Sequence, residues 1–480
     1  MKSLLRFFSL TTATQLTILI NQLILLPLQL HVWGQDYIAK WFVLFAAASL
    51  VGGADLGLRG GGHDALLASR RGDPAARAAF RPIWALTRGL FVGLTTLFLL
   101  YQWHVDRASF ALMSVVTLST VLDGLAIVRG IWCDTLGHFN RVEGVYCAAS
   151  ALRTALLAVA LWVFAASPIV AAVIMLLTAL GLLITQALVL PIPELSLRAG
   201  GFSELRLGTL LLIRWLMAEP LNTWMRINLP VIILAGLAPS AIVTTYVAIR
   251  TVLGVPRQVV IQLSRFISVL YVTQRDCGSV YTDRLVRQGI LAVTLIALLI
   301  GSVLMADNGR MLRRWLHGSD LYAENAIVLS GAVITAGLGM QLITMIMVRS
   351  GEVVEVGKRN YAYLLAGFVA AALGRYVFGS PDAYLALITA QEWLIAGLFA
   401  LRLESALRHL TFAAWAVALL ALAVMRAIVS SDPWGVFQSA APLDWVVSML
   451  YAATSVVCVA GLFLLLDRLA GPPTAAPGWT

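Results

Sequence analysis

The residues of this chain best suited to chemistry are arginines inside long apolar segments. Arg250 lies within the apolar segment 240–263, and Arg226 lies within the segment 208–235. A charged side chain at membrane depth costs roughly 3 kcal/mol on insertion scales, so such a residue usually has a use. The guanidinium group is planar and donates two parallel hydrogen bonds to an oxyanion. The pattern therefore predicts contact with an anionic group such as a phosphate.

Four further arginines extend this cationic set. Arg257 follows Arg250 by seven residues, so the two share a helical face, although Arg257 could also snorkel to the headgroups. Arg88, Arg153 and Arg214 lie within about a turn or two of the predicted cytoplasmic starts of their segments, where each could snorkel. Together these three could instead form an entry ring that attracts a phosphate headgroup.

Polar side chains accompany the arginines. Glu219, Asn222, Thr223 and Arg226 fall at i, i+3, i+4 and i+7, so they share one face of a helix. A polar face inside a membrane is tolerated where it lines a cavity. Two interpretations remain open. The face could be a cavity wall in which Arg226 contacts a phosphate, or Glu219 and Arg226 could compensate each other's charge within the helix.

Amides in the first apolar segment form a second polar group. Gln15 and Gln22 share a face, and Asn21 is adjacent. Such amides could bond sugar hydroxyls or could bridge packed helices, and the sequence favours neither.

Three acids are candidates for gating or ion coupling: Asp55, Asp123 and Glu219. Asp55 precedes Arg59 by one turn, which favours a structural pair at a helix end. Asp123 could counter an arginine across a cavity, or bind a coupling proton or sodium ion.

The composition decides what kind of molecule must position these residues. The chain has 480 residues, of which 60% are hydrophobic and only 12% are charged, and its mean hydropathy is +0.88. These values predict an all-α polytopic membrane protein. The net charge of +10 reflects basic loops between spans, so we expect no nucleic-acid partner. The cysteines and histidines are scattered, so we expect neither a metal nor a cofactor.

About fourteen segments are long enough to cross a bilayer. They are 9–31, 37–57, 83–103, 110–130, 145–166, 168–190, 208–235, 240–263, 287–306, 324–348, 361–378, 382–402, 410–429 and 445–467. Roughly 20 basic residues fall in loops on the side of the N-terminus and roughly 7 on the other. This asymmetry predicts that both termini are cytoplasmic.

A weak repeat suggests how the spans are grouped. Leu26-Pro27 and Leu229-Pro230 lie near the ends of the first and seventh spans, about 200 residues apart, as in parallel transporter repeats. The predicted divisions are a six-span N-lobe, a cytoplasmic linker, a six-span C-lobe, two further spans and a disordered tail. They occupy residues 1–190, 191–207, 208–402, 403–469 and 470–480.

Three segments carry a resemblance to a known family. Residues 37–66 contain the motif Ala-Asp-Leu-Gly-Leu at the cytoplasmic end of the second span. Residues 224–275 read as a helix, a tight turn and a second helix with a basic face, and residues 309–352 continue the pattern. This arrangement resembles the Wzx-like, polysaccharide-exporting branch of the multidrug/oligosaccharidyl-lipid/polysaccharide (MOP) flippase superfamily.

The resemblance implies both a fold and a substrate. The fold would be two six-helix lobes in a V around a cationic cavity, with two additional C-terminal helices. The substrate would be a polyprenyl-pyrophosphate-linked oligosaccharide, such as an O-antigen repeat unit, moved to the periplasmic leaflet of a bacterial inner membrane by alternating access. A polysaccharide polymerase and a chain-length regulator would be its protein partners, besides membrane lipids.

Three alternative functions remain open. A lipid II flippase is a sister possibility within the same superfamily. A MATE-type drug or cation antiporter should hold acids in its cavity, whereas embedded arginines predominate here. A membrane glycosyltransferase or polymerase generally needs a sizeable extramembrane loop with catalytic acids, and the longest loop here has about 25 residues. We therefore expect a transport protein rather than an enzyme.

Overall fold

The structure is a computed structural model whose described residues are all placed in helices and the turns that join them. They are residues 2–53, 58, 74–136, 138–190, 214–215, 217–251, 254, 260, 264, 267, 286–296, 353–401, 405–431, 457 and 461. The chain divides into two compact units, Met1–Thr244 and Thr245–Thr480. The predicted lobe boundaries differ from this division and remain predictions.

Six of the described helices are long and apolar enough to cross a membrane. They are Pro82–Val105, Phe110–Cys133, Asn140–Phe164, Pro168–Val189, Val354–Phe378 and Pro381–Ala400. Each overlaps a span predicted from the sequence, with starts that differ by up to seven residues. The chain is therefore a multi-pass membrane protein, and the total of fourteen spans stays a prediction because several segments lie outside the described residues.

The described residues of the first unit include six helices. They are α1 (Lys2–Gly52), α3 (Pro74–Val105), α4 (Phe110–Thr135), α5 (Phe139–Phe164), α6 (Pro168–Val189) and α8 (Ala218–Ala235). Helix α1 has a turn at Gly34, whose φ of 75° is readily available only to glycine. The two segments of α1 on either side of Gly34 correspond to the first and second predicted spans.

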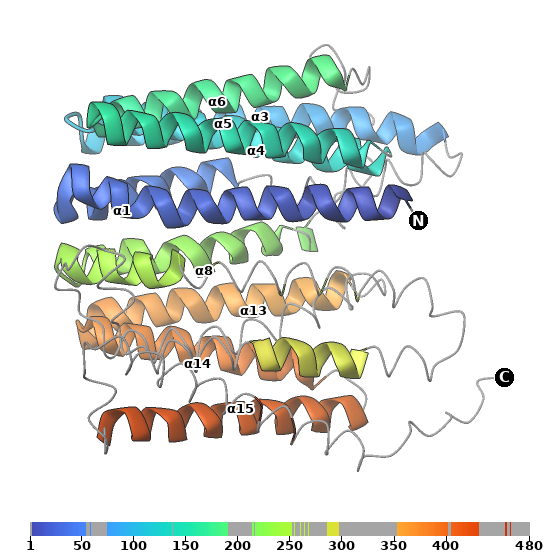
Figure 1. Cartoon of the computed structure of the whole chain (residues 1–480), viewed down its shortest axis with the longest axis vertical. Helices are drawn as coiled ribbons and strands as arrows, with labels where there is room; N and C mark the ends of the chain where they lie inside the picture. The colour runs from blue at the N-terminus through green and yellow to red at the C-terminus, as the bar shows by residue number, and fades with distance from the viewer. Residues whose placement is uncertain are drawn as a thin grey trace. The chain divides into compact units, whose positions relative to one another are not determined.

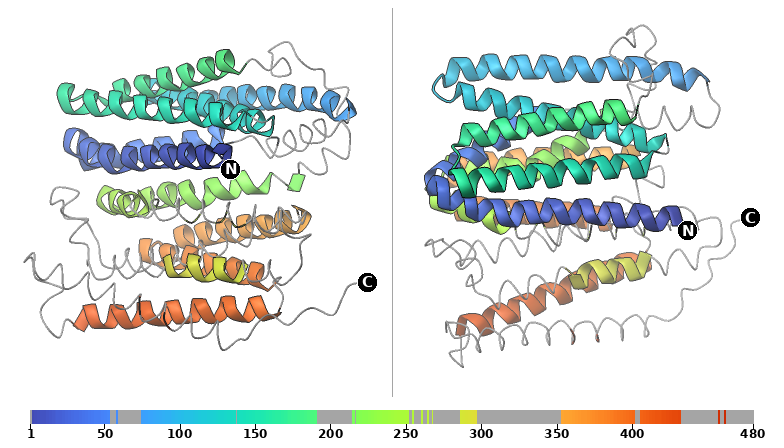
Figure 2. Two further views of the ribbon diagram at one scale, coloured as in Figure 1. Left: turned by 45° about the vertical axis from the view of Figure 1, so that its right-hand side comes forward. Right: turned by 45° about the horizontal axis from the view of Figure 1, so that its top comes forward.

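Helices α4, α5 and α6 pack side by side, with α1 against α4 and α5 (Figure 1). The views in Figure 2 keep the same neighbours. Cross-links along α1 fix its place: the Thr14 hydroxyl donates to Glu143 Oε2 over 3.2 Å, and Trp33 Nε1 donates to the Ala166 carbonyl over 2.7 Å. The first segment of α1 therefore runs parallel to α5.

The core of this unit is concentrated around α3 and α4. Trp84 and Trp132 pack edge to face with ring centroids 5.5 Å apart, among Phe91, Val128 and Leu190. Such an arrangement favours the positive edge of one ring against the negative face of the other. This cluster joins the end of α6 to α3 and α4.

The second unit contains the helical segment 286–296, α13 (Val353–Ala372), the π-helical turn η4 (Leu373–Phe378), α14 (Pro381–Ala400) and α15 (Ser405–Ser431). Helix α13 packs on α14. The π-helical turn η4 also packs on α14, which Gly374 permits because a Cβ there would lie 2.7 Å from the Tyr384 ring. Trp393 and Trp415 connect α14 to α15, with ring centroids 5.6 Å apart.

Candidate functional site

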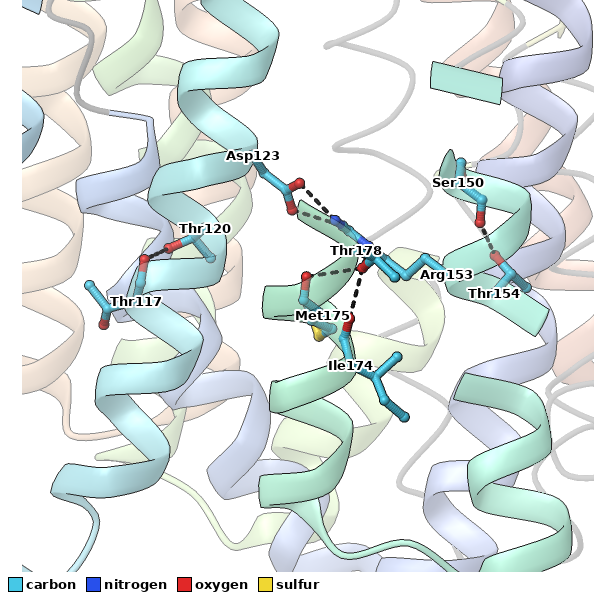
Figure 3. A network of polar contacts seen from close by, with 9 residues as sticks. All are labelled: Thr117, Thr120, Asp123, Ser150, Arg153, Thr154, Ile174, Met175 and Thr178. Atoms are coloured by element: carbon cyan, nitrogen blue, oxygen red, sulfur yellow. Dashed lines mark hydrogen bonds and ion pairs between the residues drawn. The ribbon is translucent and has the colours of Figure 1, made fainter. Parts of the chain in front are cut away.

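A polar network joins three neighbouring helices of the first unit. Arg153 on α5 donates from both terminal nitrogens to the two carboxylate oxygens of Asp123 on α4, each over 2.7 Å (Figure 3). Its Nε donates to the Thr178 hydroxyl on α6 over 2.8 Å, and that hydroxyl is within hydrogen-bond distance of the Ile174 and Met175 carbonyls. One guanidinium thus holds a carboxylate and a hydroxyl from two other helices.

The three residues lie at the same depth in the membrane. Asp123, Arg153 and Thr178 are each near the midpoint of their helix. The sequence predicted Arg153 close to the cytoplasmic start of a span beginning at residue 145. This was wrong, because α5 begins at Phe139 and Arg153 therefore lies about four turns into it. A guanidinium at mid-depth that is bound on three nitrogens does not snorkel.

The pairing also bears on the alternatives for Asp123. Its side chain is 27% exposed and that of Arg153 is 18% exposed, so water screens the pair only in part. Both carboxylate oxygens accept from the arginine. Of the alternatives for Asp123, this geometry corresponds to an acid that pairs with an arginine. The guanidinium of Arg153 already occupies the position at which a coupling ion would bind the carboxylate.

The polar residues of α8 have different surroundings. Asn222 is buried and Arg226 is half-buried, whereas Glu219 and Thr223 are exposed. Trp224 on this helix donates from Nε1 to the Ala46 carbonyl of α1 over 2.9 Å, which fixes the rotation of α8. The four residues that the sequence predicted to share one face of α8 therefore differ in exposure, and their lining of a cavity stays a prediction.

A second polar group lies in the second unit, around a buried carboxylate. Glu392 on α14 is 4% exposed and accepts a hydrogen bond from the Tyr363 hydroxyl of α13. The phenol of Tyr246 interacts electrostatically with Glu392, Arg250 and Tyr384. Arg250 itself is half-buried. The arginine singled out by the sequence therefore belongs to a group of tyrosines with one buried acid.

The other predicted residues are dispersed among the described helices. The Arg88 guanidinium lies 5.3 Å from the Trp84 ring centroid, and that of Arg214 lies 4.7 Å from Trp215. Asn21 is half-buried on α1. Predicted residues that lie outside the described residues or side chains are Gln15, Gln22, Asp55 and Arg257.

Sequence reasoning missed three buried polar residues. They are Arg129 on α4, Gln186 on α6 and Glu392 on α14, with 7%, 0% and 4% exposure. Arg129 and Gln186 lie toward the ends of apolar segments, and Glu392 lies near the middle of one. The only clue in the sequence is the residue type itself. A charged or amide side chain inside a membrane span costs free energy, so its presence there indicates a structural or functional role.

We compared the chain with known proteins in sequence and in structure. In sequence, neither protein-family models nor curated proteins give a match. In structure, the chain is similar to the lipid II flippase MurJ in an inward closed conformation. The TM-score is 0.63 at 10% identity, covering 96% of this chain and 99% of the other.

Two further solved structures support the same class. A MATE protein in complex with MaD3S gives a TM-score of 0.55 at 12% identity, covering 86% of this chain and 96% of that one. A MOP superfamily transporter from Pyrococcus furiosus, described as having a binding pocket of reverse polarity, gives 0.51 at 13% identity, covering 88% and 94%. The chain therefore shares its fold with these solved membrane proteins.

Proposed function

We propose that this chain is a MOP-type flippase that moves a polyprenyl-pyrophosphate-linked oligosaccharide across the membrane. The observation that carries the proposal is the fold, which matches a lipid II flippase along nearly the whole of both chains. The resemblance of residues 37–66, 224–275 and 309–352 to the Wzx-like branch supplies the glycan as the finer substrate. A lipid II flippase is the sister alternative.

Arginines at membrane depth support an anionic substrate. A pyrophosphate must cross a region of low dielectric, and preformed guanidinium groups offset part of its desolvation. Arg250 and Arg226 are half-buried side chains of this type. Arg153 is less suited to direct contact, because Asp123 and Thr178 already occupy three of its nitrogens.

A cation exporter is the second candidate, and the buried Glu392 favours it. MATE structures are among those that the fold matches. A cation exporter needs an available carboxylate, and Asp123 is already bound to Arg153. Glu392 is therefore a described carboxylate on which this alternative can be tested.

Substitution of Arg250 tests the flippase proposal. Losing a hydrogen bond to a charged group costs about 1.5–3 kcal/mol, so Arg250→Ala should reduce export by about tenfold or more. Arg250→Lys keeps the charge and should retain part of the function. Lipid-linked oligosaccharide accumulating on the cytoplasmic face, at normal expression, is the measurement.

The matched control is Arg107→Ala, which removes an exposed arginine from the loop between α3 and α4. This variant should export normally. Wild-type export by Arg250→Ala would remove Arg250 from the substrate site.

Glu392→Gln separates the two candidate functions. The amide keeps an acceptor for the Tyr363 hydroxyl, so the helices should stay packed. Glycan export measured under a fixed ion gradient should continue in this variant, whereas export of a cationic dye by a MATE-type antiporter should stop. The flippase proposal would be overturned by the following result: the wild type exports the dye, Glu392→Gln does not, and neither protein transports the glycan.

A further inference from the structure

Arg129 is a buried charge that hydrogen bonds satisfy only in part. It lies on α4 inside a membrane-crossing helix and is 7% exposed. Its Nη2 donates to the Leu190 carbonyl over 2.7 Å, while its Nε has no acceptor. No carboxylate in the described part of the chain pairs with it. A guanidinium with five N–H groups is therefore only partly satisfied.

Gln186 lies close to the same place. Its backbone carbonyl accepts from the Leu190 N–H, so it is one turn before the residue that Arg129 contacts. It lies on the face of α6 that is buried, together with Thr178 and Leu182. The side chain is 0% exposed, and neither amide atom has a hydrogen-bond partner. Leaving a buried polar group unpaired costs about 1–3 kcal/mol.

The surroundings add another unused donor. The Trp84 indole N–H is buried and has no acceptor, and Trp84 belongs to the same core cluster as Val128 and Leu190. Arg129 follows Val128 on α4 and bonds Leu190. Arg129 Nε, the Gln186 amide nitrogen and Trp84 Nε1 are thus buried donors without an acceptor in this region, and the Gln186 oxygen is a buried acceptor without a donor.

This balance favours an anion over a water molecule. A water would satisfy hydrogen bonds, but it would leave the arginine charge uncompensated in a buried site. The C-terminal end of α6 offers only the partial negative charge of a helix terminus. Because Arg129 and Gln186 are almost fully enclosed, the occupant must be small and detached from any lipid.

We propose that Arg129 and Gln186 form a binding site for a small inorganic anion of the halide class between α4 and α6. The anion accepts from Arg129 Nε and from the Gln186 amide and neutralises the buried charge. The site goes beyond the proposed function, since it concerns the stability of the first unit and no substrate. Its test therefore uses binding and unfolding rather than transport.

The first measurement uses the purified full-length chain in detergent. Sodium gluconate is replaced stepwise by sodium chloride at constant ionic strength, and the unfolding temperature is followed by tryptophan fluorescence. A ligand that binds only the folded state raises that temperature in a saturable way. Equilibrium binding of radioactive chloride should reveal one saturable site per chain.

Two variants and a control locate the site. Arg129→Gln removes the charge and should abolish both the shift and the chloride binding. Gln186→Glu supplies a fixed carboxylate in place of the anion. This variant should therefore be more stable than wild type in gluconate and should no longer respond to chloride. Arg107→Gln, in an exposed loop, should respond as wild type does.

Two results would overturn the proposal. One is the absence of any saturable chloride effect in the wild type, which would assign the unused donors to water. The other is a chloride effect that persists in both Arg129→Gln and Gln186→Glu. The second variant keeps the test decisive even if Arg129→Gln fails to fold, because it adds a partner for Arg129 rather than removing one.

Discussion

At the scale of single residues, the Asp123–Arg153 pair should be a strong determinant of stability. Removing one partner of a buried ion pair costs about 3–5 kcal/mol, because the other charge remains without compensation. The partial exposure of both side chains should bring the loss toward the lower end. Asp123→Asn should therefore lower the unfolding temperature of the purified chain, which fluorescence-detected size-exclusion chromatography measures.

The double variant Asp123→Leu/Arg153→Met provides the control. Replacing both charges by apolar residues of similar size is often neutral. We expect the double variant to be more stable than Asp123→Asn alone. If the losses of the two single variants simply add in the double variant, the residues do not act as a pair.

The sequence could identify these residues but not their partners. Asp123 stood out as an acid within a span, with a countering arginine as one of the open alternatives. Its actual partner is 30 positions away on another helix. A six-residue error at the start of α5 was enough to hide it, because Arg153 then appeared to lie near the membrane surface.

At the scale of helices, a glycine contact allows α1 and α4 to cross. A Cβ on Gly124 would lie 2.1 Å from the Gly52 carbonyl oxygen, a backbone atom that cannot rotate away. Overpacking of this kind costs about 1–3 kcal/mol. Gly124→Ala should therefore lower the unfolding temperature by separating the two helices.

Gly181→Ala is the matched control on α6. A Cβ there meets no atom within 4 Å, and alanine favours a helix over glycine by up to about 1 kcal/mol. This variant should be neutral or slightly more stable. Equal destabilisation by both substitutions would mean that the glycine contact is not what limits the approach of α1 to α4.

The start of α4 is expected to depend on pH through Asp106. This carboxylate lies in the loop before α4 and accepts from the Ser109 N–H over 3.2 Å. Hydrogen bonds from the side chain and backbone of Ser109 lower the pKa of Asp106 below its ordinary 3.8. Because the folded pKa is depressed, the stabilisation is present above the unfolded pKa and is lost as the pH falls through the folded one.

Asp106→Ala should thus be less stable than wild type at neutral pH, and the difference should disappear under acid conditions. Unfolding temperatures measured from about pH 7 down to about pH 3 give the profile. Asp106→Asn, which keeps an acceptor oxygen, should lose less than the alanine variant at neutral pH. A gap between wild type and Asp106→Ala that is constant with pH would contradict the role of the ionised carboxylate.

Most of the described helices could be predicted from hydropathy alone, and their ends could not. The predicted span 168–190 differs from α6 by one residue, whereas α3 begins at Pro74 rather than at residue 83. Residues 74–81 are more polar, so they extend the helix beyond the apolar window. The length of an apolar segment indicates only the part of a helix that crosses the bilayer. The backbone hydrogen bonds of the helix can continue into the polar residues beyond that segment.

At the scale of the whole molecule, the fold that the chain shares with the solved structures could be predicted from the sequence, although no family model matches it. The solved structures that share the fold are only 10–13% identical to this chain. What carried the resemblance was the order and spacing of spans, together with motifs such as Ala-Asp-Leu-Gly-Leu. The glycan did not follow from such features, because order and spacing specify architecture, and a substrate is specified by side chains in a site.

Alternating access, which we propose, requires contacts between the predicted lobes 1–190 and 208–402 to open and close. Two such contacts follow the turn at Gly34. The Ser240 hydroxyl donates to the Asp36 carboxylate, and the Thr244 hydroxyl donates to the Gln35 carbonyl over 3.4 Å. They lie one membrane crossing away from the N-terminus, on the predicted periplasmic side. Opening toward that side should break them.

A disulfide at this position should therefore block export. We expect Asp36→Cys/Ser240→Cys, in a background whose four native cysteines are serines, to export glycan when reduced and to stop when oxidised. Thr14→Cys/Glu143→Cys is the control, because it replaces another hydrogen-bonded pair but lies within one predicted lobe. Its oxidation should leave export unchanged, since both cysteines move together. Full export by the oxidised 36–240 variant, with the crosslink complete on a gel, would exclude a mechanism in which these two lobes separate on that side.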